Sequence, residues 1–372
     1  MMNRRAFLIS SSATASTLFL GTSARAAPRA RILETKVVSQ LPDLYHGWPT
    51  LARRKNGELL LVCSGGREEH VCPFGRTDFM RSTDGGETWC FPRVVMDGPI
   101  DDRDAGVLET VRGSILITNF TSLAYEPQLK NKGKRWQVAH NRTDAEGRRK
   151  SLGNWMIRST DGGLTFSGRY RVPVNSPHGP VQLGDGRLLY AGKALWTEEA
   201  KVGVCESMDD GQTWSWLADI PTRKGDNHRD YHELHAVEIP HGVLVAQIRN
   251  HNRANSGETL QCKSTDGGKT WSDPRPIGVW GLPSHLLSLK DGRLLMSYGH
   301  RRKPFGNQAR VSEDGGKTWS APLIISSDGD GHDLGYPSTV ERDDGKLVTV
   351  WYEKMAGSPR SVLRQAVWIL EP

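Results

Sequence analysis

The chain has 372 residues, of which 37% are hydrophobic and 24% are charged, and its formal net charge is +7. This composition is typical of a globular protein and excludes both a bundle of membrane-spanning helices and a long disordered tract. The basic residues are scattered and no arginine-rich helix is indicated, which argues against a nucleic-acid partner. Forty glycines, twelve tryptophans and short β-branched runs predict an all-β chain with many turns.

Residues 1–26 resemble an export signal. Arg4 and Arg5 precede apolar and small residues that end in Ala-Arg-Ala at residues 24–26, and this stretch is too short and too rich in serine to span a bilayer stably. The paired arginines followed by Phe-Leu resemble the twin-arginine signal of proteins that are exported folded, an ordinary signal being the alternative. We expect a periplasmic or secreted monomer whose residues 27–372 form one domain, with no membrane partner.

Five related octapeptides recur along the chain: STDGGETW from Ser82, STDGGLTF from Ser159, SMDDGQTW from Ser207, STDGGKTW from Ser264 and SEDGGKTW from Ser312. In each, the aspartate can accept hydrogen bonds from turn amides, and the glycine that follows permits a positive φ. The threonine and the aromatic residue then begin the next strand. These boxes are structural, so we expect their aspartates at the periphery of the fold and not in a catalytic site.

A second repeat runs in step with the first, in which a hydrophobic strand follows a tight-turn pair at residues 56–57, 112–113, 185–186, 241–242, 291–292 and 344–345. Six such units of about four strands predict a six-bladed β-propeller. The sixth unit has no octapeptide, so we expect residues 31–38 to supply its outer strand. The second unit carries an insertion at residues 122–151, which is polar and basic and is predicted to be a long loop near the rim.

The innermost strands of a propeller begin around its central channel, so equivalent positions converge on one mouth. Eight residues before each turn pair stand Trp48, Asp104, Pro177, Glu233, Pro283 and Tyr336. Their neighbours include Arg103 and five histidines: His46, His178, His232, His235 and His285. Polar residues at a wet channel mouth also occur without any chemistry.

Five Asp boxes in six units resemble the Asp-box (BNR repeat) sialidase superfamily over residues 31–370. That resemblance implies a tyrosine nucleophile, a glutamate base that assists it, an acid for the leaving group and three arginines that clamp a carboxylate. Tyr336, in GYPSTVERDDGKLVTVWYE, looks like the nucleophile. Glu233 precedes Arg249 by sixteen residues, which is similar to the spacing of the base and the second clamp arginine.

The third arginine of the clamp is expected at Arg301 or Arg302, and the sequence leaves the choice between them open. The first departs from the pattern, because Gly47 stands at its place in Tyr-His-Gly-Trp-Pro. A clamp without this bidentate fork loses geometric specificity for a carboxylate.

The leaving-group acid has no clear counterpart in GGREEHVCPFGRTD, where Glu68, Glu69 and His70 are the nearest proton donors and Arg67 is adjacent. Some sialidase-like propellers act on rhamnose or uronic-acid linkages with histidine as the acid or base. His46 could transfer protons in that way, or it could stack on Trp48 and bond a backbone carbonyl.

We expect neither a metal nor a cofactor. Residues 226–235 hold several histidines and acids, but strand alternation places His232 and Glu233 on opposite faces. The five cysteines are an odd number without Cys-x-x-Cys spacing, so neither a disulfide framework nor a zinc ribbon is indicated.

The sequence therefore predicts an exported, exo-acting glycoside hydrolase that removes a terminal acidic sugar from a glycan. The candidate catalytic residues are Tyr336, Glu233, His46 and Asp104. The candidate substrate-binding residues are Arg249, Arg301, Arg302, Arg67, Trp48, His178 and His285. Two alternatives stay open: a histidine-dependent rhamnosidase or polysaccharide lyase acting on uronic-acid linkages, and a carbohydrate-binding propeller without catalysis.

Overall fold

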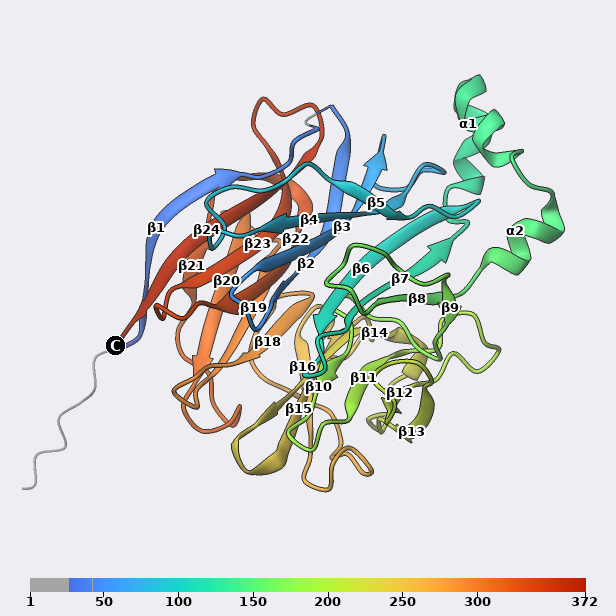
Figure 1. Ribbon diagram of the computed structural model, residues 1–372. Coiled ribbons are helices and arrows are strands. Elements are labelled where there is room, and N and C mark those ends of the chain that lie inside the picture. Colours follow the sequence, from blue (N-terminus) through green and yellow to red (C-terminus); the bar gives the residue numbers. More distant parts are fainter. Residues whose placement is uncertain (1–26, 42) are drawn as a thin grey trace, which may run out of the picture.

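Six four-stranded antiparallel sheets stand around a central channel in the computed structural model, which describes residues 27–41 and 43–372 (Figure 1). This is the predicted six-bladed β-propeller. The proposed export signal at residues 1–26 lies outside the described residues.

The blades follow the chain, each running from an inner strand to an outer one. Blade 1 contains β2 (Tyr45–Arg53), β3 (Leu59–Arg67), β4 (Arg76–Ser82) and β5 (Arg93–Met96). Blade 2 contains β6 (Asp101–Glu109), β7 (Ile115–Ser122), β8 (Asn154–Ser159) and β9 (Tyr170–Arg171). Blade 3 contains β10 (Val181–Gln182), β11 (Leu188–Lys193), β12 (Val202–Ser207) and β13 (Ser215–Asp219).

Blade 4 contains β14 (Tyr231–Ile239), β15 (Val243–Asn250), β16 (Thr259–Ser264) and β17 (Arg275–Pro276). Blade 5 contains β18 (Ser284–Ser288), β19 (Leu294–His300), β20 (Gly306–Ser312) and β21 (Leu323–Ser326). Blade 6 contains β22 (Gly329–Glu341), β23 (Leu347–Met355), β24 (Ser361–Glu371) and, outermost, β1 (Arg29–Val37). Two short 3₁₀ turns, His228–Asp230 and Pro240–Gly242, flank β14.

The ring closes by pairing the first strand of the described chain with the last. β1 runs antiparallel to β24, from Arg29 opposite Glu371 to Val37 opposite Arg364. Ile32 packs against a buried cluster that includes Trp368. The N-terminal strand is therefore the outer strand of blade 6, as the sequence predicted.

The Asp boxes form the turns between the third and fourth strands of blades 1 to 5. In the fourth box, Asp266 Oδ1 accepts hydrogen bonds from Ser264 Oγ at 2.8 Å and from the Thr270 amide at 2.9 Å. These contacts, with one from the Thr270 hydroxyl, lower the pKa of Asp266 to about 2. The box aspartates lie at the surface of the blades and serve the turns, as expected.

A repeated backbone distortion marks the inner strands. Five non-glycine residues at or beside the predicted positions have positive φ angles of 52°, 47°, 73°, 43° and 53°: Trp48, Asp104, His178, Glu233 and Tyr336. The strand pairing shifts register beside four of them, in β2, β6, β14 and β22. Such bulges re-aim side chains, and each left-handed residue costs about 1–2 kcal/mol. In blade 3 the residue with the positive φ angle is His178, one position after Pro177, where the sequence count placed the equivalent residue.

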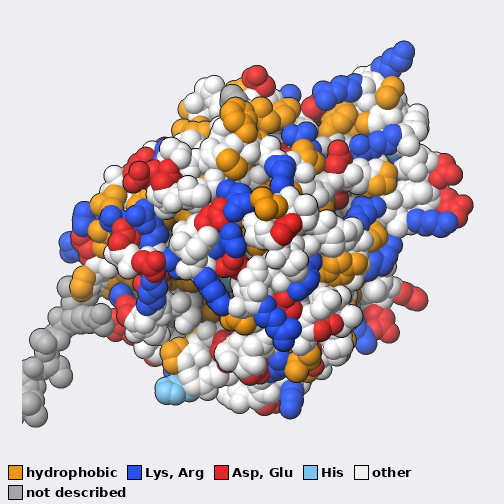
Figure 2. All heavy atoms as spheres, viewed as in Figure 1, with side chains coloured by type: hydrophobic (Ala, Val, Ile, Leu, Met, Phe, Trp, Pro, Cys, Tyr) orange, Lys and Arg blue, Asp and Glu red, His pale blue; other side chains and the backbone are white. Residues whose placement is uncertain are grey.

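The insertion in blade 2 corrects one expectation, because it is helical and not an extended loop. A 3₁₀ turn (Glu126–Asn131) leads into α1 (Lys134–His140) and α2 (Ala145–Ser151), which project from the edge of the propeller (Figure 1). The Asp144 side chain caps α2 by accepting from the Gly147 amide at 2.7 Å. Trp136 of α1 is buried against Cys72, so the helices are anchored to blade 1. The last turn of α2 is basic and its first turn is acidic, and Figure 2 shows side chains of both charges at this edge.

No helix within residues 27–41 and 43–372 is long and apolar enough to cross a membrane.

Candidate functional site

Three polar side chains from blades 4 and 6 meet at the channel. Tyr336 on β22 donates a short hydrogen bond to Glu233 Oε1 on β14. Arg249 on β15 donates from Nη1 to Glu233 Oε2 at 2.5 Å and to the Tyr336 hydroxyl oxygen at 3.2 Å. The bulges at Tyr336 and Glu233 turn these side chains toward each other, so residues 103 positions apart in the sequence form one cluster.

The charges of this cluster favour a protonated phenol beside a carboxylate. Burial and the Glu233 charge raise the pKa of Tyr336 well above its usual value, although Arg249 opposes them. Burial works against ionisation of Glu233, but the Arg249 guanidinium and the Tyr336 hydrogen bond outweigh it and lower the pKa of Glu233. Glu233 is therefore an anionic acceptor already in contact with the proton that a tyrosine nucleophile must lose.

Asp104 lies beside this cluster and is only 5% exposed. Burial raises its pKa to about 7; Arg103 opposes the shift and the Glu233 charge adds to it. Within the described residues its buried Oδ1 has no hydrogen-bond partner. Asp104 can therefore hold or release a proton near neutral pH.

Trp48 forms an aromatic platform next to Tyr336. Its ring meets Tyr336 edge to face with centroids 6.3 Å apart, and Tyr352 lies 5.7 Å away. The guanidinium carbons of Arg103 and Arg67 lie 4.4 and 4.9 Å from the centre of the indole. Because Trp48 is only 2% exposed, it supports the site more than it offers open surface to a ligand.

The structure decides between the two neighbouring arginines. Arg301 donates from Nε to the Leu334 carbonyl at 3.0 Å, and its guanidinium carbon lies 5.8 Å from the centre of the Tyr336 ring. Arg302 instead lies over Trp280, at 5.5 Å. Arg301 therefore faces the cluster, and the expectation that Arg302 binds substrate is corrected.

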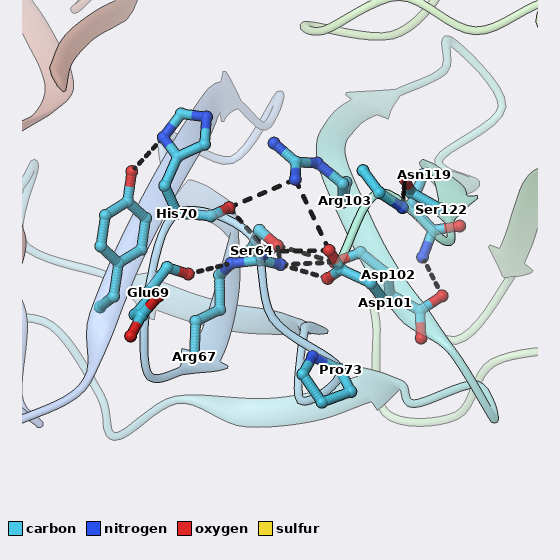
Figure 3. A network of polar contacts seen from close by, with 12 residues as sticks. Ser64, Arg67, Glu69, His70, Pro73, Asp101, Asp102, Arg103, Asn119 and Ser122 are labelled. Carbon is cyan, nitrogen blue, oxygen red and sulfur yellow. Dashed lines mark hydrogen bonds and ion pairs between the residues drawn. The ribbon is translucent and has the colours of Figure 1, made fainter. Parts of the chain in front are cut away.

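Arg67 is also corrected, because its guanidinium is fully buried. It donates to both carboxylate oxygens of Asp101, at 2.6 and 3.0 Å, and to the His70 carbonyl at 2.9 Å (Figure 3). A bidentate buried pair of this kind fixes a loop and leaves the fork occupied. The partner Asp101 lies 34 residues away in blade 2, a pairing that the sequence did not reveal.

His46 is corrected in the same way. Its ring is 2% exposed, and its Nδ1–H donates to the Leu44 carbonyl at 3.0 Å. Burial lowers the pKa of His46 to about 4. A neutral histidine with one nitrogen engaged by the backbone fits the structural alternative, so His46 leaves the catalytic candidates.

His178 and His285 lie deeper in the channel than expected. With His235 they line a cavity of about 330 Å³ bordered by residues that run toward the tight turns, such as 51–53 and 286–288. The three rings contact one another, with centroids 4.6 to 5.4 Å apart, and burial lowers the pKa of each. This cavity contains none of Tyr336, Glu233 and Arg249, so both expectations of substrate contact are corrected.

Sequence reasoning missed a second polar group at the site, formed by Tyr45, His70, Asp333 and Tyr352. Asp333 accepts hydrogen bonds from the hydroxyls of Tyr45 and Tyr352, each at 3.0 Å. The sequence indicates His70 only as one of three nearby proton donors. The one available signal was the position of Asp333, three residues before Tyr336 on the same strand.

No group of three or more histidine, cysteine, aspartate or glutamate side chains suited to a metal ion occurs in the part of the chain that the structure describes.

Comparisons with known proteins agree with this architecture. The profile of a family described as "BNR repeat-like domain" matches residues 130–349. A sialidase from Micromonospora viridifaciens is 26% identical over 242 residues, which cover 55% of this chain and 35% of that protein. The chain thus matches about a third of the length of this curated relative.

Solved structures share the fold at low identity. A Dyadobacter fermentans protein of unknown function superposes with a TM-score of 0.75 at 24% identity, covering 92% of this chain and 99% of that one. The intramolecular trans-sialidase of Ruminococcus gnavus gives 0.64 at 15% identity, covering 87% and 94%. The NanB sialidase of Streptococcus pneumoniae gives 0.66 at 15% identity, covering 92% and 70%.

Proposed function

The chain belongs to the BNR repeat-like, Asp-box sialidase superfamily, and from this premise we propose that it is an exo-acting glycoside hydrolase that removes a terminal acidic sugar from a glycan. The observation that carries the proposal is the contact of Tyr336, Glu233 and Arg249 at the channel. A binding protein has no need of a phenol that donates a hydrogen bond to a largely buried carboxylate.

In the proposed reaction, the Tyr336 hydroxyl oxygen attacks the anomeric carbon while Glu233 takes the phenol proton. The bond to the leaving group breaks, and the sugar is held on the enzyme as an aryl glycoside until water displaces it. Arg249 holds Glu233 in the anionic form that can accept the proton. Two displacements on opposite faces give retention of configuration.

The charge of the sugar follows from the arginines. Arg249 and Arg301 both approach Tyr336, and two guanidinium groups beside one ring favour an anion between them. A tyrosine nucleophile suits such a substrate, because a neutral phenol is not repelled by a carboxylate as an aspartate would be. We therefore propose a sugar that carries a carboxylate, with sialic acid as the default.

A rhamnosidase or lyase acting on uronic-acid linkages is the second candidate. The observation that favours it is Gly47, which stands where the first clamp arginine of a sialidase is expected. The purified protein should be assayed against sialosides, rhamnosyl-glucuronides and neutral capped glycans, and absorbance of an unsaturated product should be followed. Release of free acidic sugar supports the hydrolase, unsaturated product supports a lyase, and binding without turnover supports a lectin-like role.

The decisive variant is Tyr336→Phe. Only the transition state uses the phenol oxygen as a nucleophile, so kcat should fall by about 100-fold or more while substrate binding changes little. Initial rates and calorimetric titration of substrate would separate the two effects. A variant that keeps wild-type turnover would exclude Tyr336 as the nucleophile and contradict the proposed mechanism.

A further inference from the structure

The loop that follows β3 holds three proton donors close to the platform at Trp48, and the structure separates their roles. Glu68 accepts hydrogen bonds from Arg135 and from Trp136 Nε1, the latter at 2.6 Å. Glu69 pairs with Lys132 of the same helical insertion. Both carboxylates therefore anchor the insertion, and only His70 remains available to the site.

Two arginines with little exposed surface, Arg67 and Arg103, hold the backbone of His70 in place. Its carbonyl accepts hydrogen bonds from Arg67 Nη2 at 2.9 Å and from Arg103 Nη1 at 3.2 Å (Figure 3). Arg67 is itself fixed by Asp101. The position of the His70 backbone is therefore fixed by arginines from blades 1 and 2, although the residue belongs to a loop.

The imidazole of His70 is oriented by Asp333. Nδ1 lies 2.9 Å from Asp333 Oδ1, and the Tyr45 hydroxyl, which donates to Asp333, lies 3.0 Å from the same nitrogen. Asp333 also accepts from Tyr352, and these contacts lower its pKa although burial opposes them. An anionic Asp333 fixes the proton of His70 on Nδ1 in the neutral ring. Among the described residues, Nε2 makes no hydrogen bond.

His70 and Tyr336 flank the same aromatic platform. The Trp48 ring lies 4.9 Å from the His70 ring and 6.3 Å from the Tyr336 ring. Tyr352 joins the two sides, since its hydroxyl binds Asp333 and its ring lies 5.8 Å from Tyr336. The His70 side chain is 48% exposed, so its free edge is open to a ligand that enters the site beside Tyr336.

We propose that His70 is the general acid and base of the reaction, positioned by Asp333, in place of the carboxylic acid that the sequence lacks. This inference rests on the proposed function and assigns the leaving-group side of the same site. Imidazolium gives its proton near neutral pH, so a histidine held on a carboxylate can do the work of an acid with a raised pKa.

The proton balance closes over both steps. When Tyr336 forms its bond to the anomeric carbon, the glycosidic bond breaks, the leaving oxygen takes the proton of His70 Nε2, and Glu233 takes the phenol proton. In the second step water gives a proton to His70 Nε2 and its oxygen attacks the anomeric carbon. The bond to Tyr336 then breaks and the phenolate recovers its proton from Glu233.

The test compares leaving groups that differ in their need for a proton: 4-methylumbelliferyl sialoside, with an acidic leaving group, and sialyllactose, with a basic one. His70→Gln keeps a polar side chain beside Asp333 but cannot act as an acid. It should lose about 100-fold or more in kcat on sialyllactose and far less on the aryl sialoside. His241→Asn, at the exposed tight turn that joins β14 to β15 at the opposite end from Glu233, is the matched control and should behave as wild type.

Asp333→Asn tests the positioning role through the pH profile. The charged groups facing His70 are Asp333 on its ring and Arg67 and Arg103 on its backbone. Because asparagine cannot carry the Asp333 charge, the alkaline limb of the kcat profile on sialyllactose should move to lower pH in this variant, while the rate on the aryl sialoside changes little.

The outcomes distinguish this inference from the proposed function. Equal losses on both substrates for His70→Gln, or an alkaline limb of kcat that Asp333→Asn leaves unchanged, would overturn the role of His70 and point to Asp104 as the acid. Tyr336→Phe should be inactive on both substrates whichever residue is the acid. Full activity of that variant, or a wild type that cleaves neither sialoside, would overturn the proposed function and this inference with it.

Discussion

Asp104 shows at the scale of one residue how burial turns an ordinary carboxyl into a group that titrates near neutrality. Its backbone is left-handed, and its buried carboxyl faces the charges of Glu233 and of arginines such as Arg103. A buried carboxyl without a full set of hydrogen bonds destabilises the fold when it ionises. The site therefore carries a stability cost that depends on pH.

Asp104→Asn should reveal that cost. The pKa of an aspartate in an unfolded chain is about 4, whereas burial in the folded protein raises the pKa of Asp104 to about 7. Between these values the folded state binds more protons, so its contribution to stability is present at low pH and is lost as the pH rises through about 7. The slope is at most about 1.4 kcal/mol per pH unit.

The variant should therefore gain stability over wild type at about pH 8 relative to about pH 5, as measured by urea unfolding at both pH values. Gln261→Glu, at a buried position of β16 that contacts the fifth Asp box, would show whether any buried charge change has the same effect. A wild-type-to-variant difference that is the same at both pH values would mean that Asp104 stays ionised in the folded protein.

At the scale of an element, the outer strand β1 shows how the ring resists opening. A propeller has two ends that must be joined, and here β1 pairs with β24 along its whole length while Ile32 covers the cluster around Trp368. The inner strands β22 and β2 then lie side by side, which keeps Tyr336 next to Trp48. Pairing of β1 with β24 at the rim therefore helps to hold Tyr336 and Trp48 in contact at the site.

Deletion of residues 27–38 should lower the melting temperature by about 5 °C or more, because it exposes apolar surface and leaves the backbone of β24 unpaired. Differential scanning calorimetry would measure the change. Deletion of residues 27–28 alone, which removes chain before the strand, is the control and should have little effect. Equal melting temperatures for both truncations would show that β1 contributes nothing to closure.

At the scale of the whole molecule, the fold is completed only when the last strand is present. β24 ends at Glu371 and pairs with a strand that begins at Arg29, so the longest contacts span nearly the entire chain. Such a topology folds after synthesis is complete and slowly compared with local structures. A pathway that exports folded proteins suits it, and we propose that residues 1–26 direct the chain to that pathway.

Replacement of Arg4 and Arg5 by lysine should therefore leave the protein in the cytoplasm of a bacterial host while the purified domain keeps its fold. Cell fractionation with immunodetection would measure the distribution. An unaltered chain in a strain without the twin-arginine translocase provides the control and should also be retained. Export of the lysine variant at the wild-type level would favour the ordinary signal instead.

The sequence by itself determined the fold and the main cluster, because both depend on local patterns. The Asp boxes and turn pairs specify hairpins over a few residues, and their repetition specifies six blades. The same counting placed Glu233 and Tyr336 at equivalent ends of inner strands, and the sixteen-residue spacing that resembles the family added Arg249; the structure brings the three together. Period alone is enough for the two strand positions, whereas Arg249 needed the resemblance.

The tertiary structure alone decided which charged side chains stay free for chemistry. Arg67 is occupied by Asp101, Glu68 by the helical insertion, and His46 by a backbone carbonyl, whereas His70 is oriented by Asp333 from the other end of the chain. Each of these outcomes depends on partners that the ring closure brings together from distant blades. Sequence spacing lists the groups that could react, but burial and long-range pairing select among them.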